Sequence, residues 1–259
     1  MIAPGAPGIP PRWTSSAKSG VGTATGNRSR VWFPLSHGIV NEVYFPRLDQ
    51  ANTRDCGLIV TDGRGYFSEE KRHAASAILP LAQGVPGYRV ANTCLQKNYR
   101  IEKTVVTDPA RDVLLQRVRF EALHGRLTDY HLYVLLAPHI GNCGYGNHGW
   151  VGEYNGVTML FAERDGTCLA LACSTPFAGL SCGYVGASDG WRTVQDTPTI
   201  DTGIGVHCVD LPTGVLPPGT EIRFTFFWPE ADHWEGMDFS ITAGGCGRQS
   251  PGANPQPAG

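Results

Sequence analysis

The sequence contains no long hydrophobic run and few charged side chains. Among its 259 residues, no apolar run approaches the roughly 18 consecutive residues that a membrane-spanning helix requires. Charged residues make up 17% of the composition, and the formal net charge is −2. Such a chain lacks the basic excess that nucleic acids and acidic membrane surfaces attract. We therefore expect neither a nucleic acid nor a membrane among its partners.

Long amphipathic helices are also absent from the sequence. No stretch of about ten residues repeats apolar side chains at helical spacing, and the single short candidate lies near Glu69–Ser76. Instead, short apolar runs such as Cys56–Thr61, Tyr99–Thr107 and Thr167–Cys173 alternate with turns rich in glycine and proline. The sequence therefore predicts an all-β fold with little helix, in the form of a large antiparallel β-sandwich.

The N-terminal residues lack the features of a secretory signal. Met1–Trp13 (MIAPGAPGIPPRW) has no basic region followed by an apolar region, so we expect a cytoplasmic protein. Eight cysteines could pair in a secreted chain, but without a signal reduced thiols are the favoured interpretation. The cysteine spacing matches no CxxC zinc site. We expect no bound cofactor and no metal.

Composition divides the chain into three parts. Residues 1–28 are rich in Gly, Pro, Ser and Thr, and we expect a loose arm with at most one short strand. Residues 29–242 hold the strand patterns and are expected to form the sandwich. Residues 243–259 are rich in Gly, Pro, Gln and Ser and have little to bury, so they are expected to form a disordered tail.

One short motif is typical of hydrolases. Gly186–Gly190 fits G-x-S-x-G, which in α/β-hydrolases places a serine, here Ser188, on a turn from a strand into a helix. Asp196 and His207 follow in the chain order serine, acid, histidine. However, the next residues, Trp191–Thr199 (WRTVQDTPT), do not open a helix. A plain β-turn is therefore the favoured interpretation.

Three histidines are further candidates for catalysis or metal binding. His139 and His148 flank the Gly/Asn-rich stretch PHIGNCGYGNHGW (138–150), but their spacing matches no compact metal template. His37 follows Ser36 directly. Adjacent side chains on a strand point to opposite faces, which disfavours a nucleophile–base pair, although a turn at this position would relax that restriction. Ser188, His37, His139 and His148 are thus weak catalytic candidates, and His139 and His148 are weak metal candidates.

The same Gly/Asn-rich stretch contains better candidates for contact with a sugar. Long Gly-rich loops often carry function, and aromatic rings can stack on pyranose faces. Aromatic side chains also fill sandwich cores, which is the alternative interpretation. The predicted binding residues are Trp150, Tyr145, Asn142 and Asn147.

Four stretches together resemble one enzyme family. They are Ser29–Arg72 (beginning SRVWFPLSHGIVNEVYFPRLD), Ile101–Phe120, Tyr133–Asn142 and Met159–Ser174. All are similar to the N-terminal region of bacterial glucoamylases of glycoside hydrolase family 15, and they cover about residues 20–190. In that family this region forms a super-β-sandwich domain that packs against a catalytic (α/α)6 barrel. The resemblance therefore implies a super-β-sandwich here.

A second resemblance begins after residue 190. Residues 191–242, which include GTEIRFTFFWPEADHWEGMDF, resemble the extreme C-terminal β segment of the same enzymes, which follows the barrel. The resemblance thus implies a glucoamylase from which the barrel is missing. Family members invert configuration with two carboxylic acids on barrel loops, and no position here matches those motifs. The carboxylates that are present, such as Glu69–Glu70, are interpreted as turn or surface groups.

The sequence leaves two functions open. The first is a structural or weak carbohydrate-binding module with an oligosaccharide or small-molecule ligand. Such a module would self-associate through the face that the barrel covers in the family. The second is a hydrolase with a newly acquired ester, lactone or phosphoester activity in a cleft uncovered by loss of the barrel. The missing catalytic carboxylates favour the first, although sites can be grafted onto any scaffold.

Overall fold

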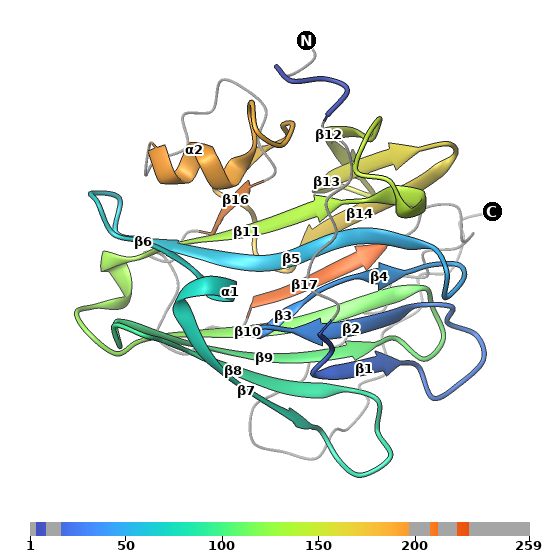
Figure 1. Cartoon of the computed structure of the whole chain (residues 1–259), viewed down its shortest axis with the longest axis horizontal. Coiled ribbons are helices and arrows are strands. Elements are labelled where there is room, and N and C mark those ends of the chain that lie inside the picture. Colours follow the sequence, from blue (N-terminus) through green and yellow to red (C-terminus); the bar gives the residue numbers. More distant parts are fainter. Residues whose placement is uncertain (1–3, 9–16, 197–207, 212–221, 228–259) are drawn as a thin grey trace, which may run out of the picture.

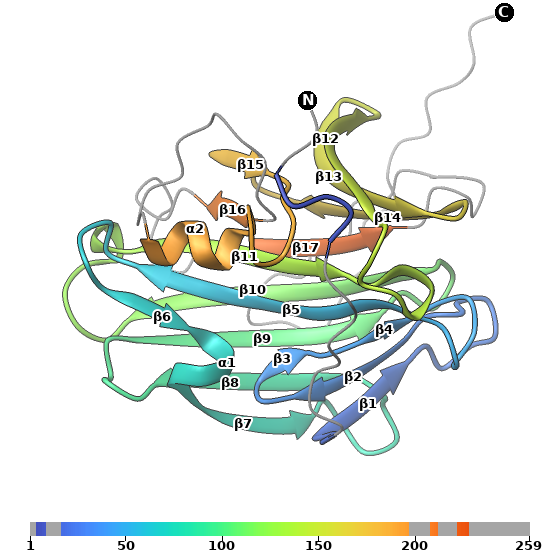
Figure 2. The ribbon, with the colours of Figure 1, turned by 45° about the horizontal axis from the view of Figure 1, so that its top comes forward.

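Two antiparallel sheets pack face to face in the computed structural model, which describes residues 4–8, 17–196, 208–211 and 222–227 (Figures 1 and 2). The prediction of an all-β sandwich is confirmed. In the described part of the chain the α-helices are α1 (Glu70–His73) and α2 (Gly190–Asp196), with 3-10 turns at Leu127–Asp129 and Ile140–Asn142. None of the described helices is long and apolar enough to cross a membrane.

The first sheet has nine strands. Their bounds are β1 (Gly20–Thr23), β2 (Trp32–Ser36), β3 (Ile39–Val40), β4 (Val43–Tyr44), β5 (Ala51–Thr61), β6 (Phe67–Glu69), β11 (His131–Pro138), β15 (Gly179–Ser181) and β16 (Cys208–Leu211). Their order is β1-β2-β3-β5-β11-β16-β15, with β4 paired to β2 and β5, and β6 paired to β5.

The second sheet has eight strands. Their bounds are β7 (Ala74–Pro80), β8 (Tyr88–Cys94), β9 (Tyr99–Thr107), β10 (Val113–Ala122), β12 (His148–Tyr154), β13 (Val157–Arg164), β14 (Thr167–Cys173) and β17 (Ile222–Phe227). Their order is β12-β13-β14-β17-β10-β9-β8-β7. Since β16 lies between β11 and β15, and β17 between β14 and β10, residues 191–242 contribute an inner strand to each sheet.

The core between the sheets is built by strands whose residues alternate between buried and partly exposed. Along β9, every second residue from Tyr99 to Thr107 is buried, and the residues between them are partly exposed. Tyr99, Ile101 and Val105 have no exposed surface and meet apolar residues of β5 and β11 from the facing sheet. A period of two and short apolar runs are the two patterns that predict the strands of this chain, and β9 shows the first of them.

The helix predicted near Glu69–Ser76 is confined to α1. From Ala74 the chain continues as the edge strand β7. The interpretation of Glu70 as a surface or turn group was wrong, because its side chain is completely buried. One turn of helix points this carboxylate inward, where polar groups of both sheets surround it.

Glu70 binds donors from both sheets. Its carboxylate accepts a hydrogen bond from the Leu58 backbone N–H of β5, with a distance of 3.0 Å. It also accepts one from the Asn92 amide of β8 and lies 2.7 Å from the Lys103 ammonium of β9. The Asn92 amide further donates to the Gly38 carbonyl at 2.8 Å, and a Cβ at Gly38 would collide with the Asn92 side chain. These contacts fix α1 and the two sheets relative to one another.

The Glu70→Gln variant tests this arrangement. It leaves the buried Lys103 ammonium without a counter-charge, so we expect the free energy of unfolding to fall by about 3–5 kcal/mol. The double variant Glu70→Gln/Lys103→Met should regain much of that loss, because it removes the uncompensated charge. Urea unfolding followed by circular dichroism measures both, with the exposed Glu121→Gln as control. A single variant as stable as the control would contradict the arrangement.

Candidate functional site

Two asparagines hold the predicted binding loop in shape. The Asn142 amide donates to the carbonyl of residue 49 (2.6 Å) and accepts from the N–H of residue 51 (2.9 Å). The Asn147 amide accepts from the N–H of residue 140 (3.1 Å) and donates to the carbonyl of residue 143 (2.7 Å). Both amides are thus engaged with backbone groups, and their observed contribution is to position the loop.

His139 is a packed side chain at the base of this loop. Only 1% of its surface is exposed, and its backbone N–H donates to the Asn52 carbonyl at 2.8 Å. Burial lowers the pKa of its imidazole to about 4, and the positive charge of Arg54 acts in the same direction, while Glu42 opposes both. His139 is therefore neutral at neutral pH.

The two candidate metal ligands lie in different environments. His148 begins β12 and is exposed, opposite Glu163 of β13, whereas His139 is buried. Across the described residues, no cluster of three or more His, Cys, Asp or Glu side chains could hold a metal ion.

Tyr145, between the two histidines in sequence, exposes 48% of its surface, and its neighbour Gly146 donates to the Pro7 carbonyl at 2.8 Å.

The turn after β2 brings Ser36 and His37 together. The Nδ1 atom of His37 lies 3.1 Å from the Ser36 hydroxyl, because His37 adopts a left-handed conformation with φ of 51°. The argument from opposite strand faces therefore fails at this turn. Ser36 is nevertheless completely buried, so a substrate has no direct access to its hydroxyl.

Ser188 joins two segments of backbone. Its hydroxyl accepts a hydrogen bond from the Tyr184 N–H (2.9 Å) and donates one to the Pro4 carbonyl (2.7 Å). The preceding strand β15 ends at Ser181, and a turn separates it from Ser188. The strand–elbow–helix geometry of a nucleophilic serine is thus missing here. The Asp196 side chain and His207 lie outside the described residues.

The expectation that no helix follows Ser188 was wrong. The Asp189 carboxylate accepts hydrogen bonds from the N–H groups of Gly186 (2.6 Å) and Arg192 (3.1 Å), and it caps the first turn of α2. Val194 is buried against β5 and β11, and the Trp191 indole donates to Glu69 at 2.8 Å. A helix of seven residues that buries so few side chains leaves no repeating pattern in the sequence.

Trp150 forms an open aromatic platform on β12. Its ring stacks on Phe161 of β13, with an interplanar angle of 12° and 5.3 Å between centroids. Trp150 is 43% exposed and Phe161 only 8%, so one ring is open to solvent and the other supports it. A Cβ at Gly152 would approach both rings to about 3.1 Å, so this glycine leaves room for the stack. An open flat indole suits contact with the apolar face of a sugar.

Phe161 is the residue of this platform that the sequence did not single out. It lies directly opposite Trp150 in the β12–β13 register. The signal that could have revealed it is the hairpin turn Asn155-Gly156, which sets that register. The Gly/Asn-rich stretch was predicted as one loop, but strand β12 begins within it at His148, and Trp150 is therefore held on a sheet.

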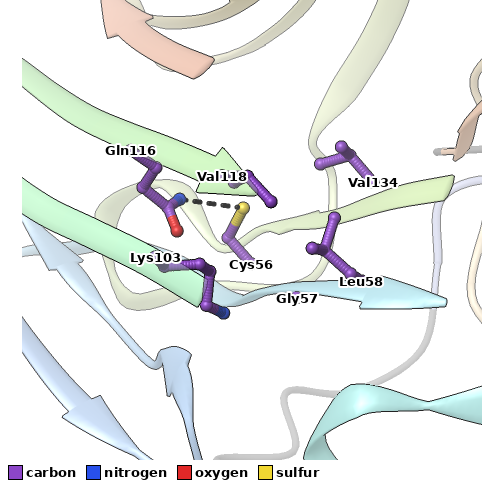
Figure 3. A pocket seen from close by; sticks show the side chains of 7 residues that line it. All are labelled: Cys56, Gly57, Leu58, Lys103, Gln116, Val118 and Val134. Atoms are coloured by element: carbon purple, nitrogen blue, oxygen red, sulfur yellow. Dashed lines mark hydrogen bonds between the residues drawn. The ribbon is translucent and has the colours of Figure 1, made fainter. Parts of the chain in front are cut away.

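A small cavity between the sheets is unsuited to a substrate. Its volume of about 10 Å³ has room for a single water molecule. Figure 3 shows the Gln116 amide directed at the Cys56 thiol beside it, with a separation of 3.6 Å. The lining residues are Cys56, Gly57, Leu58, Lys103, Gln116, Val118 and Val134. This cavity belongs to the core.

The low pKa of His139 predicts a dependence of stability on pH. Its pKa in the fold, about 4, lies below the ordinary 6.5, so the unfolded chain binds the proton first as the pH falls. The contribution of neutral His139 to the free energy of unfolding is complete above pH 6.5. It should fall by about 2–3 kcal/mol as the pH is lowered to 4. Urea unfolding across this range should show a flatter profile for His139→Asn. The exposed His148→Asn serves as control, and parallel profiles for all three proteins would contradict the prediction.

Comparison with known proteins places this fold in a family. The sequence profile described as "Glucodextranase, domain N" matches residues 3–206. A glucoamylase of Clostridium sp. (strain G0005) is 39% identical over 183 residues, which make up 71% of this chain and 26% of that protein. A crystal structure of a bacterial glucoamylase complexed with acarbose superposes with a TM-score of 0.84 at 32% identity.

The similarity covers part of the larger proteins. The superposition with the solved glucoamylase includes 90% of this chain and 35% of that chain. The chain thus spans about a quarter of the curated relative and about a third of the solved structure. No helical barrel occurs among the residues described here. The sandwich topology and the long sequence match together show that the chain belongs to the family of glucodextranase N domains.

Proposed function

We propose that this chain is a glucoamylase-type β-sandwich that serves as a structural and carbohydrate-binding module. Its ligand would be an α-glucan oligosaccharide, the class of sugar that the names of its relatives suggest. The observation that carries the proposal is the Trp150 indole, held flat on Phe161 and open to solvent at the edge of a sheet. Stacking of this kind contributes modest affinity, in keeping with a weak binding module.

The hydrolase alternative lacks comparable support. Its candidate side chains have separate structural environments: Ser188 bonds to backbone, His139 is packed in the interior, and His37 contacts a buried serine. A hydrolytic site requires a nucleophile and a base within hydrogen-bond reach of each other and of a substrate. No pair among these candidates meets both conditions in the described residues.

Calorimetric titration with maltoheptaose tests the binding function. We expect the wild-type chain to bind weakly and Trp150→Ala to lose about tenfold in affinity, because stacking on the indole is removed. Leu79→Ala is the control, since Leu79 is also exposed but lies on β7 at the opposite edge of the same sheet. No binding by the wild type, or equal binding by all three proteins, would refute the proposal.

A further inference from the structure

Within the part of the chain that the structure describes, strand β12 is an edge of the second sheet that no other segment pairs with. Edge strands carry unpaired N–H and C=O groups, and proteins usually protect them. The edge strand β1 is covered by the Tyr88 hydroxyl, which bonds to both the N–H and the C=O of Val21 (3.1 and 2.9 Å). Strand β15 has only three residues, and β7 ends in Pro80. Strand β12 has seven residues and none of these protections.

The turn that follows β12 determines which of its backbone groups point outward. Asn155 and Gly156 connect β12 to β13 with φ values of 50° and 76°, as in a two-residue type I′ turn. The pair that flanks such a turn, Tyr154 and Val157, exchanges both hydrogen bonds, and bonded pairs then alternate along the hairpin. Three residues of β12 therefore direct their N–H and C=O groups away from β13: Gly149, Val151 and Glu153. Among the described residues, nothing bonds to these outward groups.

We propose that β12 pairs with β12 of a second copy of this chain, antiparallel, with the twofold axis at Val151. In this register Val151 faces the partner subunit's Val151, and Gly149 faces the partner subunit's Glu153. The outward N–H and C=O groups of both strands then bond to each other, in about six N–H···O hydrogen bonds. In the same register Trp150 lies opposite the partner subunit's Gly152, on the same face of the extended sheet.

Charge selects this register. An axis at Glu153 would place two carboxylates directly opposite each other, which is destabilising. With the axis at Val151, each Glu153 faces a glycine, and the centre of the interface is apolar. Trp150 and Val151 are each 43% exposed in the single chain, so pairing would cover apolar surface that is otherwise in water. A second copy supplies this complementary pattern without any further partner.

The hairpin of β12 and β13 stands at one end of the second sheet. Figure 2 shows β12 and the adjoining part of β13 projecting from the body of the sandwich. An interface of one strand per copy is small, so the dimer is expected to depend on protein concentration. The inference is argued from the strand edge and does not require the proposed sugar binding, although pairing would cover part of the Trp150 surface. The sequence led us to expect self-association through the face that the barrel covers in the family, and the present inference specifies one strand, β12, as the contact.

A disulfide at the axis gives a direct test. Directly opposite residues of a hydrogen-bonded pair lie about 5.5 Å apart between Cα atoms, within disulfide range. Val151→Cys should therefore form a covalent dimer under mild oxidation, seen on non-reducing gels and, in mass spectra, as a peptide pair linked through the two introduced cysteines. Val157→Cys is the matched control, because Val157 is similarly exposed (40%) but lies on β13, away from the proposed axis. Equal cross-linking of both variants and the wild type would overturn the proposal.

Amide hydrogen exchange tests the same contact in the unmodified chain. The N–H groups of Gly149, Val151 and Glu153 should exchange about tenfold more slowly as concentration rises from about 10 µM to 1 mM. Val151→Pro removes the outward N–H at the axis and keeps the bonds between β12 and β13, so it should abolish this slowing. Exchange at these residues that does not change with concentration would contradict the dimer, as would slowing confined to another strand such as β7.

Discussion

The structure depends on a carboxylate that has no access to water. Glu70 is completely buried, and such a group is stable only when partners satisfy its charge and lone pairs. The donors that do so come from β5 in the first sheet and from β8 and β9 in the second. One side chain therefore joins both sheets and holds α1 against them. Strands β8 to β10 then continue the second sheet, whose other end carries β12 and β13 (Figure 1).

The candidate functional surface lies at the end of the sheet that is far from this buried ion pair. There, β12 pairs with β13 and, among the described strands, with no other, and its aromatic side chain is supported by a residue of β13. The loop before it is fixed by the amides of Asn142 and Asn147. The hydrogen-bonded loop and the paired strand position the indole, which is the preorganisation that the proposed contact with a sugar face requires.

The sequence predicted the architecture well and the site only in part. Alternation of buried and exposed residues identified β9 at its observed bounds, because burial on one face leaves a period of two, and a continuous apolar run identified β14. It did not reveal β12, in which Gly149 and Gly152 interrupt the pattern, nor α2, which is too short to show a helical period. Glu70 was misread because burial of a carboxylate depends on partners from distant strands. Trp150 was identified, but its support by Phe161 requires the strand register.

A crystal structure of this chain soaked with a linear malto-oligosaccharide tests the central claim most directly. The claim is that a glucoamylase-type sandwich binds a glucan through an exposed aromatic ring at its sheet edge. It predicts a glucose ring stacked parallel to the Trp150 indole at about 4 Å, with the Trp150–Phe161 stack unchanged. A sugar bound elsewhere with Trp150 left open, or no bound sugar in crystals where the Trp150 face is accessible, would contradict it.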